Sequence, residues 1–316
     1  MNYNVCVLRN FAIAAIVLHH SFCVMSGWPP HSPVLATLPS ACVLFSSLLK
    51  IFGMAVFTFI SGYVLSFQSR KPETFATFLR KKVLRVLWPM LCFALFYWAL
   101  FPQYMLDVRI APVEGTHLWY LPVIFLCIVT TASHFFTRHG WLVCAAVYGI
   151  MCVLGGVAYE RTIHEFLTYY PTFYAGFWCA QTGFVERILE KTARKHQIAL
   201  LGGVIAAILL GVGVIAVRFY LIQLLLAALC SYVVVLWAHG NRPLSRLFLT
   251  LSRQSFSIYL FHQFIINALL LSGLFDAQPW YVVVLSLFLP AFVLPWLIDV
   301  QVSIAYKKQV KPVKNV

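Results

Sequence analysis

Long apolar runs alternate with short polar segments along the whole chain. Each run lasts about 17–25 residues, the length that an α-helix needs to cross the hydrocarbon core of a bilayer. A membrane β-barrel would instead show segments of about ten residues with alternating polarity. We therefore predict an all-α fold, a polytopic membrane helix bundle of ten transmembrane helices. The predicted spans are residues 5–26, 43–67, 86–104, 118–136, 141–158, 168–184, 198–217, 219–238, 256–273 and 281–305.

The composition also indicates a membrane protein. Apolar residues make up 62% of the 316 residues, charged residues only 10%, and the mean hydropathy is +0.86. Soluble domains have about 45–50% apolar and about 25% charged residues, so a soluble chain of this size could not bury so much apolar surface. Because the polar connections are short, we expect a single domain over residues 1–316.

The distribution of charge predicts the orientation in the membrane. The formal net charge is +14, which in a soluble chain would suggest a nucleic-acid partner. Ten spans place both termini on one side, and 19 of the 23 Lys and Arg residues fall there, including those of the basic tail 306–316. Only Arg109, Arg161 and Arg218 fall on the other side, and Lys50 lies within a span. By the positive-inside rule we predict cytoplasmic termini, a location in the cell (inner) membrane and no nucleic-acid partner.

Small residues within the apolar runs are interpreted as packing residues. The nine cysteines all fall inside these runs and none forms a CxxC pair, so we expect neither a disulfide framework nor a metal site. A cysteine in such a position is usually a small core or lipid-facing residue. Ser61-Gly62, near the end of the second span, permits the close approach of a neighbouring helix.

The first predicted span carries two ionisable residues on one face. Arg9 and His20 are 11 residues apart, and eleven steps of about 100° leave a net rotation of only about 20°. The rise between them is about 16 Å, roughly half of the hydrocarbon core. Ionisable groups at such depth are costly and usually face a cavity or a partner. The pair is a candidate site; the alternative is that Arg9 snorkels to the interface and His20 forms a hydrogen bond within the bundle.

A basic cluster precedes the third span, in the predicted loop FLRKKVLRVLWP at residues 78–89. Its members are Arg80, Lys81, Lys82 and Arg85. Arg and Lys at this spacing can clamp phosphate groups. Clusters of this kind also anchor the cytoplasmic ends of helices and bind anionic lipid, and this alternative stays open.

Two further spans carry polar residues that suit a site. His117 and Trp119 open the fourth span on the predicted outer side, where they line an outer mouth or belong to an interfacial aromatic belt. Ser255, Tyr259 and His262 share one face of the ninth span by their spacing. They bind a substrate or brace two helices. The residues alone do not decide between these alternatives.

Taken together, these segments resemble acyltransferase family 3, the bacterial integral-membrane O-acyltransferases that modify surface polysaccharides and related glycans. The resemblance covers most of the chain. Two positions depart from the family's pattern, because His19 stands where the family often has Gly and Lys82 where it often has Arg. The order and spacing of five segments carry the resemblance: Arg9 and His20 followed by Ser21, FISGYVL at 59–65, FLRKKVLRVLWP at 78–89, HLWYL at 117–121 and SIYLFH at 257–262.

The resemblance implies transfer of an acyl group, most often acetyl, from cytoplasmic acyl-CoA to a sugar hydroxyl of a cell-surface or lipid-linked glycan. Acetyl-CoA would be a co-substrate, and no metal would be needed. The phosphates of CoA would meet the basic cluster, with Arg9 deeper in the membrane. The residues that this assigns to the donor are Arg80, Lys82, Arg85, Tyr259 and His262.

The resemblance also implies roles at the reacting centre and on the acceptor side. His20 would be the general base that takes the proton of the sugar hydroxyl, or alternatively the carrier of a transient acyl group. The sequence does not separate these two mechanisms. His117, Trp119 and Ser21 would lie on the acceptor side, where aromatic faces suit sugar rings.

Two other interpretations of the sequence remain. A membrane transporter or flippase of a glycan or lipid-linked sugar would also have ten spans with buried charges, although many transporters show internal repeats and this sequence shows none. A membrane-bound O-acyltransferase of the other major superfamily would share the chemistry but differ in helix layout. The early Arg9 and His20 pair and the short loops argue against it.

Overall fold

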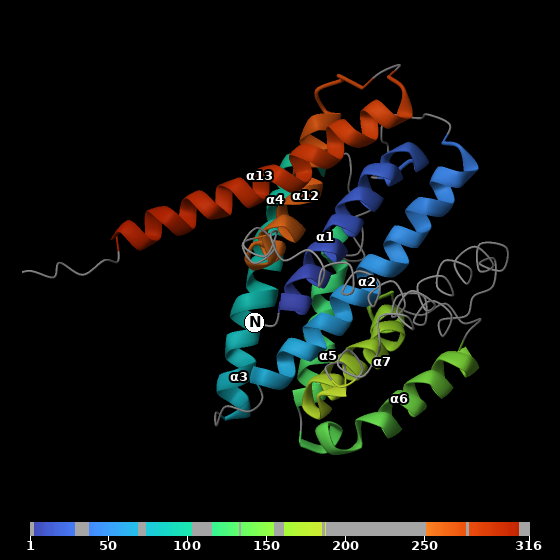
Figure 1. Cartoon of the computed structure of the whole chain (residues 1–316), viewed down its shortest axis with the longest axis vertical. Coiled ribbons are helices and arrows are strands. Elements are labelled where there is room, and N and C mark those ends of the chain that lie inside the picture. The colour runs from blue at the N-terminus through green and yellow to red at the C-terminus, as the bar shows by residue number, and fades with distance from the viewer. Residues whose placement is uncertain are drawn as a thin grey trace, which may run out of the picture.

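The computed structural model describes an all-helical chain (Figure 1). It describes residues 3–28, 38–68, 74–102, 116–132, 134–154, 161–184, 187, 251–275 and 278–309. Every regular element among these residues is a helix, which confirms the predicted fold class. The predicted spans 198–217 and 219–238 lie outside the described residues. Ten spans and cytoplasmic termini therefore stay predictions.

The described chain contains helices of very different length. The three shortest are η1 and η4, which are 3-10 helices, and η2, which is a single π-helical turn. The elements are α1 (Tyr3–Cys23), η1 (Val24–Ser26), α2 (Ser40–Gln68), α3 (Phe75–Lys82), η2 (Val83–Leu87), α4 (Trp88–Leu100), η4 (His117–Trp119), α5 (Tyr120–Ala132), α6 (His134–Leu154), α7 (Arg161–Thr182), α12 (Ser255–Leu270) and α13 (Trp280–Gln309).

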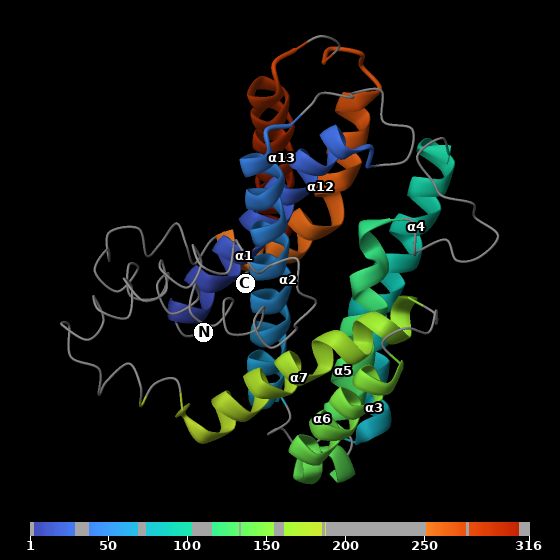
Figure 2. The ribbon, with the colours of Figure 1, turned by 90° about the vertical axis from the view of Figure 1, so that its right-hand side faces the viewer.

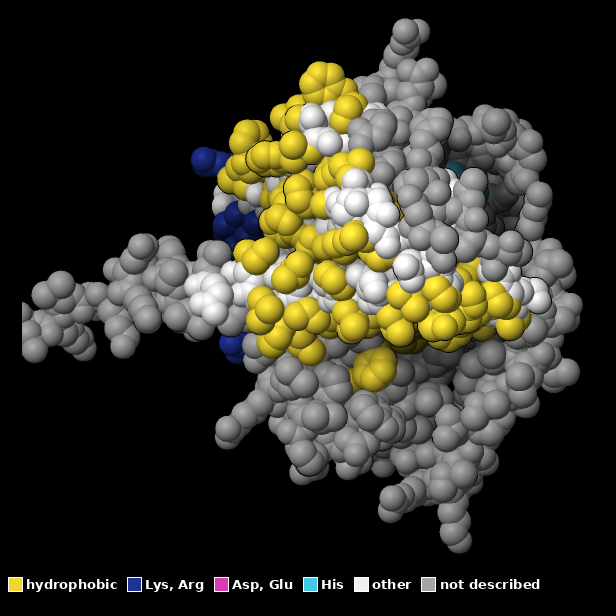
Figure 3. Space-filling view, turned by 90° about the horizontal axis from the view of Figure 1, so that it is seen from above, with side chains coloured by type: hydrophobic (Ala, Val, Ile, Leu, Met, Phe, Trp, Pro, Cys, Tyr) yellow, Lys and Arg dark blue, Asp and Glu magenta, His cyan; other side chains and the backbone are white. Residues whose placement is uncertain are grey.

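Four helical stretches of the described chain are long and apolar enough to cross a membrane. Two shorter apolar helices, His117–Ala132 and Ser255–Leu270, lie among them. Large apolar side chains cover much of the described surface, with Lys and Arg toward one side of the face in Figure 3. Such a surface suits lipid rather than water, so the protein is a membrane protein. The four stretches are Val5–Ser26, Ser40–Phe67, Phe75–Leu100 and Trp280–Asp299.

The basic segment before the third span is helical, which corrects the prediction of a loop there. Thr74 caps the N-terminus of α3, because its hydroxyl accepts a hydrogen bond from the backbone N–H of Thr77 at 3.4 Å. Arg, Lys and Leu are good helix formers, and no Gly or Pro interrupts the segment before Pro89. The helix therefore continues through η2 into α4 as one stretch.

Two other helices begin earlier than predicted. The predicted span 141–158 corresponds to α6, which starts at His134 and bends at His139, where φ is −115° and ψ is 23°. The predicted span 168–184 corresponds to α7, which starts at Arg161 and contains Pro171. Neighbouring helices can satisfy the backbone groups that a proline frees within a membrane helix. Pro171 therefore lies inside α7, as it does inside the predicted span.

The closest helix crossing joins α2 to α7, which pack together over the largest contact in the described chain (Figure 2). A Cβ atom at Gly62 would overlap the carbonyl oxygen of Phe173, and one at Gly176 would overlap that of Phe59. Each glycine thus faces the other helix's backbone. This confirms the interpretation of Ser61-Gly62 as a site of close helix approach.

Helix α1 lies between α2 on one side and α12 and α13 on the other, and it packs against all three (Figure 1). Arg9 of α1 contacts the backbone of Ser252, just before α12, and His20 contacts His262 further along α12. Both contacts advance in the same direction, so α1 and α12 run parallel. The predicted topology gives the same direction, because an odd number of spans separates the first span from the ninth. These two spans would therefore cross the membrane in the same sense.

Candidate functional site

Three histidines from separate parts of the chain meet at one end of α1. The ring centroids of His20 on α1 and His262 on α12 are 5.2 Å apart, and those of His117 in η4 and His262 are 4.7 Å apart. His117 and His262 are buried, whereas His20 is partly exposed. We call His20, His117 and His262 the histidine cluster. Sequence spacing placed each residue on its own helix, and the structure shows that the three helices bring them together.

The tautomer of His262 follows from its hydrogen bonds. Its Nδ1 lies 2.7 Å from the carbonyl oxygen of Tyr259 and 3.1 Å from that of Ile258. A carbonyl only accepts, so Nδ1 carries the proton and Nε2 presents its lone pair. The buried Nε2 of His262 and the buried Nδ1 of His20 have no hydrogen-bond partner among the described residues. Two neighbouring rings thus each hold one buried nitrogen that is available to a proton or a ligand.

Two tyrosine hydroxyls fix the elements around the cluster. The hydroxyl of Tyr259 donates a hydrogen bond to the backbone carbonyl of His117, which joins α12 to η4. The hydroxyl of Tyr120 lies 2.8 Å from Oγ1 of Thr58, which itself donates to the carbonyl of Met54 at 2.7 Å. Tyr120 therefore donates to Thr58 and joins α5 to α2. The first of these bonds ties η4, which carries His117, to α12, which carries His262.

Tyr259 and His262 lie beside His117, although the resemblance assigned the first two to the donor and the third to the acceptor side. The ring centroids of His117 and Tyr259 are 5.4 Å apart. The structure thus brings the two predicted groups into one cluster around His20. Their roles stay predictions.

Trp28 is a neighbour of the cluster that was not predicted from the sequence. Its ring centroid lies 4.7 Å from that of His20. The helical segment ends in a Schellman motif, because the N–H of Trp28 donates to the carbonyl of Cys23 at 3.1 Å and that of Gly27 to the carbonyl of Val24 at 3.4 Å. Gly27 adopts φ 79°, a conformation that favours glycine. The Ser-Gly-Trp sequence after the apolar run is the signal that could have indicated this turn.

A second polar group lies beside the cluster on the same end of α1. Nδ1 of His19 lies 2.9 Å from the hydroxyl oxygen and 3.0 Å from the carbonyl oxygen of Ser46 on α2. Sγ of Cys23 lies 3.3 Å from Nε2 of His19. The four-residue spacing of His19 and Cys23 places both on one helix face, a signal that was present in the sequence but was not used. We call His19, Cys23 and Ser46 the Cys–His–Ser group.

Arg9 lies toward the opposite end of α1 from His20. Its Nη1 is 3.5 Å from the carbonyl oxygen of Ser252, and its guanidinium carbon lies 6.0 Å from the ring centroid of Phe57. Its Nε is buried without a hydrogen-bond partner among the described residues. A guanidinium with an unused donor in such surroundings can bind an anionic group.

The basic residues of the third span lie on α3 and η2, away from the histidine cluster along the sequence. Arg80 and Arg85 are exposed, and Lys82 is half-buried with Nζ 5.2 Å from the ring centroid of Phe78. This arrangement leaves the two guanidinium groups accessible to an anion. It suits both a phosphate-binding patch and an anchor at the membrane surface.

The remaining two predicted residues differ in exposure. Ser21 is fully buried, and its hydroxyl donates to the carbonyl of Val17 within α1 at 3.0 Å. Trp119 is half-buried against aromatic rings, with its centroid 6.0 Å from that of Tyr120 and 6.2 Å from that of Tyr169. Trp119 can therefore offer part of a ring face to a ligand, whereas Ser21 engages its own helix.

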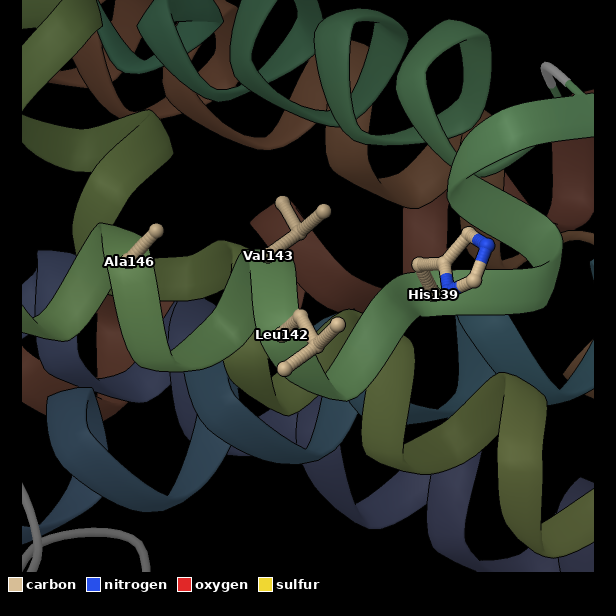
Figure 4. A pocket seen from close by; sticks show the side chains of 4 residues that line it. All are labelled: His139, Leu142, Val143 and Ala146. Carbon is tan, nitrogen blue, oxygen red and sulfur yellow. The ribbon is translucent and has the colours of Figure 1, made fainter.

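A shallow recess lies elsewhere, on α6 (Figure 4). It has a volume of about 360 Å³, and its lining residues His139, Leu142, Val143 and Ala146 all come from that helix. No predicted site residue lines it. Among the described residues, no group of three or more His, Cys, Asp or Glu side chains is arranged to hold a metal ion.

The fold and the site together define a class of protein. Helices of membrane length pack around a cluster of three histidines, and these are the features of a membrane protein with polar groups in its helical interior. A family model described as an acyltransferase domain, that of acyltransferase family 3, matches residues 2–300, nearly the whole chain. The chain belongs to this family, which supports an acyltransferase activity. No curated protein and no solved structure matched the chain.

Proposed function

We propose that the protein transfers an acyl group, acetyl in the first instance, from cytoplasmic acyl-CoA to a sugar hydroxyl of a cell-surface or lipid-linked glycan. The observation that carries this proposal is the position of His20. It lies partly exposed where α1, η4 and α12 meet, it has a buried nitrogen without a partner among the described residues, and its ring lies close to those of His262 and Trp28. Family membership supports acyl transfer as the reaction.

The acyl-CoA donor would bind along α1, starting from the N-terminal end of this helix. The predicted orientation puts the N-terminal end of α1 and the exposed Arg80 and Arg85 on the cytoplasmic side. Phosphates of CoA would bind these guanidinium groups and Lys82, because arginine forks match phosphate oxygens. Arg9 lies between this end and the histidine cluster, where its buried Nε could bind an anionic or carbonyl oxygen of the donor.

His20 would act as the general base. It would take the proton of the sugar hydroxyl while the oxygen attacks the carbonyl carbon of the acyl thioester. His262 would support this role as a positioning residue. Its ring lies next to that of His20, and a rotation of the two rings would let its unpartnered Nε2 accept the Nδ1–H of His20 and leave Nε2 of His20 as the base. A transient acyl group on His20 is the alternative mechanism, and the geometry accommodates both.

The acceptor sugar would enter over aromatic faces near His20. Trp28 is the nearest such ring, and the half-buried Trp119 is the last residue of η4, just before α5, on the predicted outer side. Sugar rings stack on such faces through their C–H groups. The predicted acceptor residue His117 would act mainly through its contact with His262.

The experiment that tests the proposal supplies the purified protein, in vesicles, with acetyl-CoA labelled in the acetyl group and a lipid-linked glycan acceptor. We expect label in the glycan fraction and release of free CoA. A flippase, the second candidate, would move the unlabelled glycan across the vesicle membrane without CoA. Glycan translocation without any acyl transfer, across a panel of acyl-CoA donors and glycan acceptors, would contradict the proposal.

A further inference from the structure

Arg9 holds a positive charge in the interior of the bundle without a carboxylate partner in the described chain. Its Nη1 contacts a neutral group, the carbonyl of Ser252 at 3.5 Å, and its guanidinium carbon lies 6.0 Å from the ring centroid of Phe57. Its Nε is buried and has no hydrogen-bond partner among the described residues. A buried charge is costly unless an opposite charge or hydrogen bonds compensate for it. This guanidinium is therefore suited to bind an anion.

The hydroxyl of Ser252 is a second polar group at the same place. Ser252 is fully buried, and its Oγ has no hydrogen-bond partner in the part of the chain that the structure describes. Its carbonyl is already occupied, because it accepts from Arg9 and, at 3.1 Å, from the hydroxyl of Ser255. The residue that contacts Arg9 thus keeps one buried donor for a ligand. We call Arg9 and Ser252 the Arg–Ser pair.

The separation between the Arg–Ser pair and the histidine cluster indicates which group of a ligand the pair can reach. Arg9 and His20 are 11 residues apart on α1, a rise of about 16 Å. Their contacts in the parallel segment, Ser252 and His262, are ten residues apart, a rise of about 15 Å. The two measures agree. A ligand that reacts at His20 therefore needs an extended arm of this length to reach Arg9.

The pantetheine arm of acyl-CoA has this length between its thioester and its diphosphate. Thirteen covalent bonds join the thioester sulfur to the first phosphorus, and an extended chain advances about 3.3–3.6 Å for every three bonds, so the arm spans about 15 Å. The two amide carbonyls of the arm lie only about 5 Å and about 9 Å from the sulfur by the same count. The length therefore matches the diphosphate and not the amides.

We infer that Arg9 and Ser252 bind the diphosphate of the acyl-CoA donor while its thioester lies at His20. This inference rests on the proposed function and divides the phosphates of the donor between two places. The Arg–Ser pair binds the diphosphate, and the basic cluster on α3 and η2 binds the 3′-phosphate of the nucleotide. The part of the donor that α1 recognises is then the 4′-phosphopantetheine unit.

The test measures the binding of 4′-phosphopantetheine and of pantetheine to the full-length protein in nanodiscs by titration calorimetry. We expect the wild-type protein to bind the phosphorylated compound at least on the order of tenfold more tightly, because its phosphate accepts charge-assisted hydrogen bonds. Arg9→Gln should abolish this preference, and Ser252→Ala should reduce it. Ser252→Ala removes a buried hydroxyl without a partner in the described chain, so the unliganded variant should keep or raise its melting temperature.

Two control variants separate the diphosphate from other effects. Thr172→Val on α7 is the matched control, because Thr172 also has a buried hydroxyl without a partner among the described residues. It should keep the preference for 4′-phosphopantetheine. Arg85→Gln should lower kcat/KM for acetyl-CoA relative to acetyl-dephospho-CoA, which lacks the 3′-phosphate, and it should also keep the preference for 4′-phosphopantetheine over pantetheine.

Transfer from acetyl-CoA to the glycan is measured in parallel, which separates this inference from the proposed function. Equal binding of 4′-phosphopantetheine and pantetheine by a wild-type protein that transfers acetyl would overturn the inference and leave the proposed function standing. A preference that survives in both Arg9→Gln and Ser252→Ala would also overturn it. A preference that these variants lose, without transfer from any acyl-CoA, would support the phosphate site and contradict the proposed transfer.

Discussion

Individual side chains around His20 differ in how directly they would touch the reacting atoms. His20 is partly exposed, whereas His262 is fully buried and its Nδ1 is committed to backbone carbonyls. His262 would therefore act through His20 and not on the substrate. Arg9, the other member of the predicted stripe, contacts Phe57 and Ser252 toward the other end of α1, where it would serve the donor.

The positioning role of His262 predicts a graded response to substitution. His262→Leu removes the accepting lone pair, and we expect the rate of acyl transfer to fall on the order of tenfold or more, with little change in the KM for acyl-CoA. His262→Gln keeps an accepting oxygen and should retain more of the rate than His262→Leu. Steady-state kinetics and the pH dependence of kcat measure this, and equal, wild-type rates in both variants would exclude the role.

The basic residues on α3 and η2 predict an effect on donor affinity. Charge reversal at Lys82 and Arg85 together should weaken binding of acyl-CoA on the order of tenfold, because two charge-assisted contacts are lost. Titration with CoA at two salt concentrations measures this, and the difference should shrink at high salt. Arg187→Glu, at an exposed arginine just after α7, is the control. Unchanged affinity in the double variant would leave the cluster as a membrane anchor only.

At the scale of elements, the glycines at the α2–α7 crossing control the packing of the bundle. Gly62→Ala would place a methyl group on the carbonyl of Phe173, and we expect a loss of about 1–3 kcal/mol of stability. Gly149→Ala on α6 is a matched control, because a Cβ there meets no atom within 4 Å; it should be neutral or slightly stabilising. Apparent melting temperatures in detergent measure both, and equal values would contradict the account of the crossing.

Much of the element pattern follows from the sequence because a membrane-length apolar run has few other solutions. The pattern of apolar runs did not reveal where α3 begins, since this short helix is rich in Arg and Lys and lacks an apolar run. The spacing of Arg9 and His20 predicted a shared face of α1, and in the structure both side chains contact the segment of Ser252 and His262. The meeting of His20 with His262 depends on which helices are neighbours, and the contacts of Trp28 and Ser46 depend on the turn at Gly27 and on α2. Spacing along one helix contains none of this information.

At the scale of the whole molecule, the asymmetry of charge fixes a testable topology. The predicted ten-span topology places 19 Lys and Arg residues on one side and three on the other, so we predict that the termini are cytoplasmic. Alkaline phosphatase fused after residue 115 should be active, because that segment is predicted outside, and the same enzyme fused after residue 316 should be inactive. An active C-terminal fusion would show an odd number of spans or the opposite orientation.

The central claim, acyl transfer at His20, is tested most directly by one comparison in vesicles supplied with labelled acetyl-CoA and the glycan acceptor. We predict that His20→Ala inserts and folds with an unchanged melting temperature but transfers label to the glycan only at the background rate. His164→Ala on α7, a histidine outside the histidine cluster, should transfer at the wild-type rate. Wild-type transfer by a folded His20→Ala protein would contradict the account.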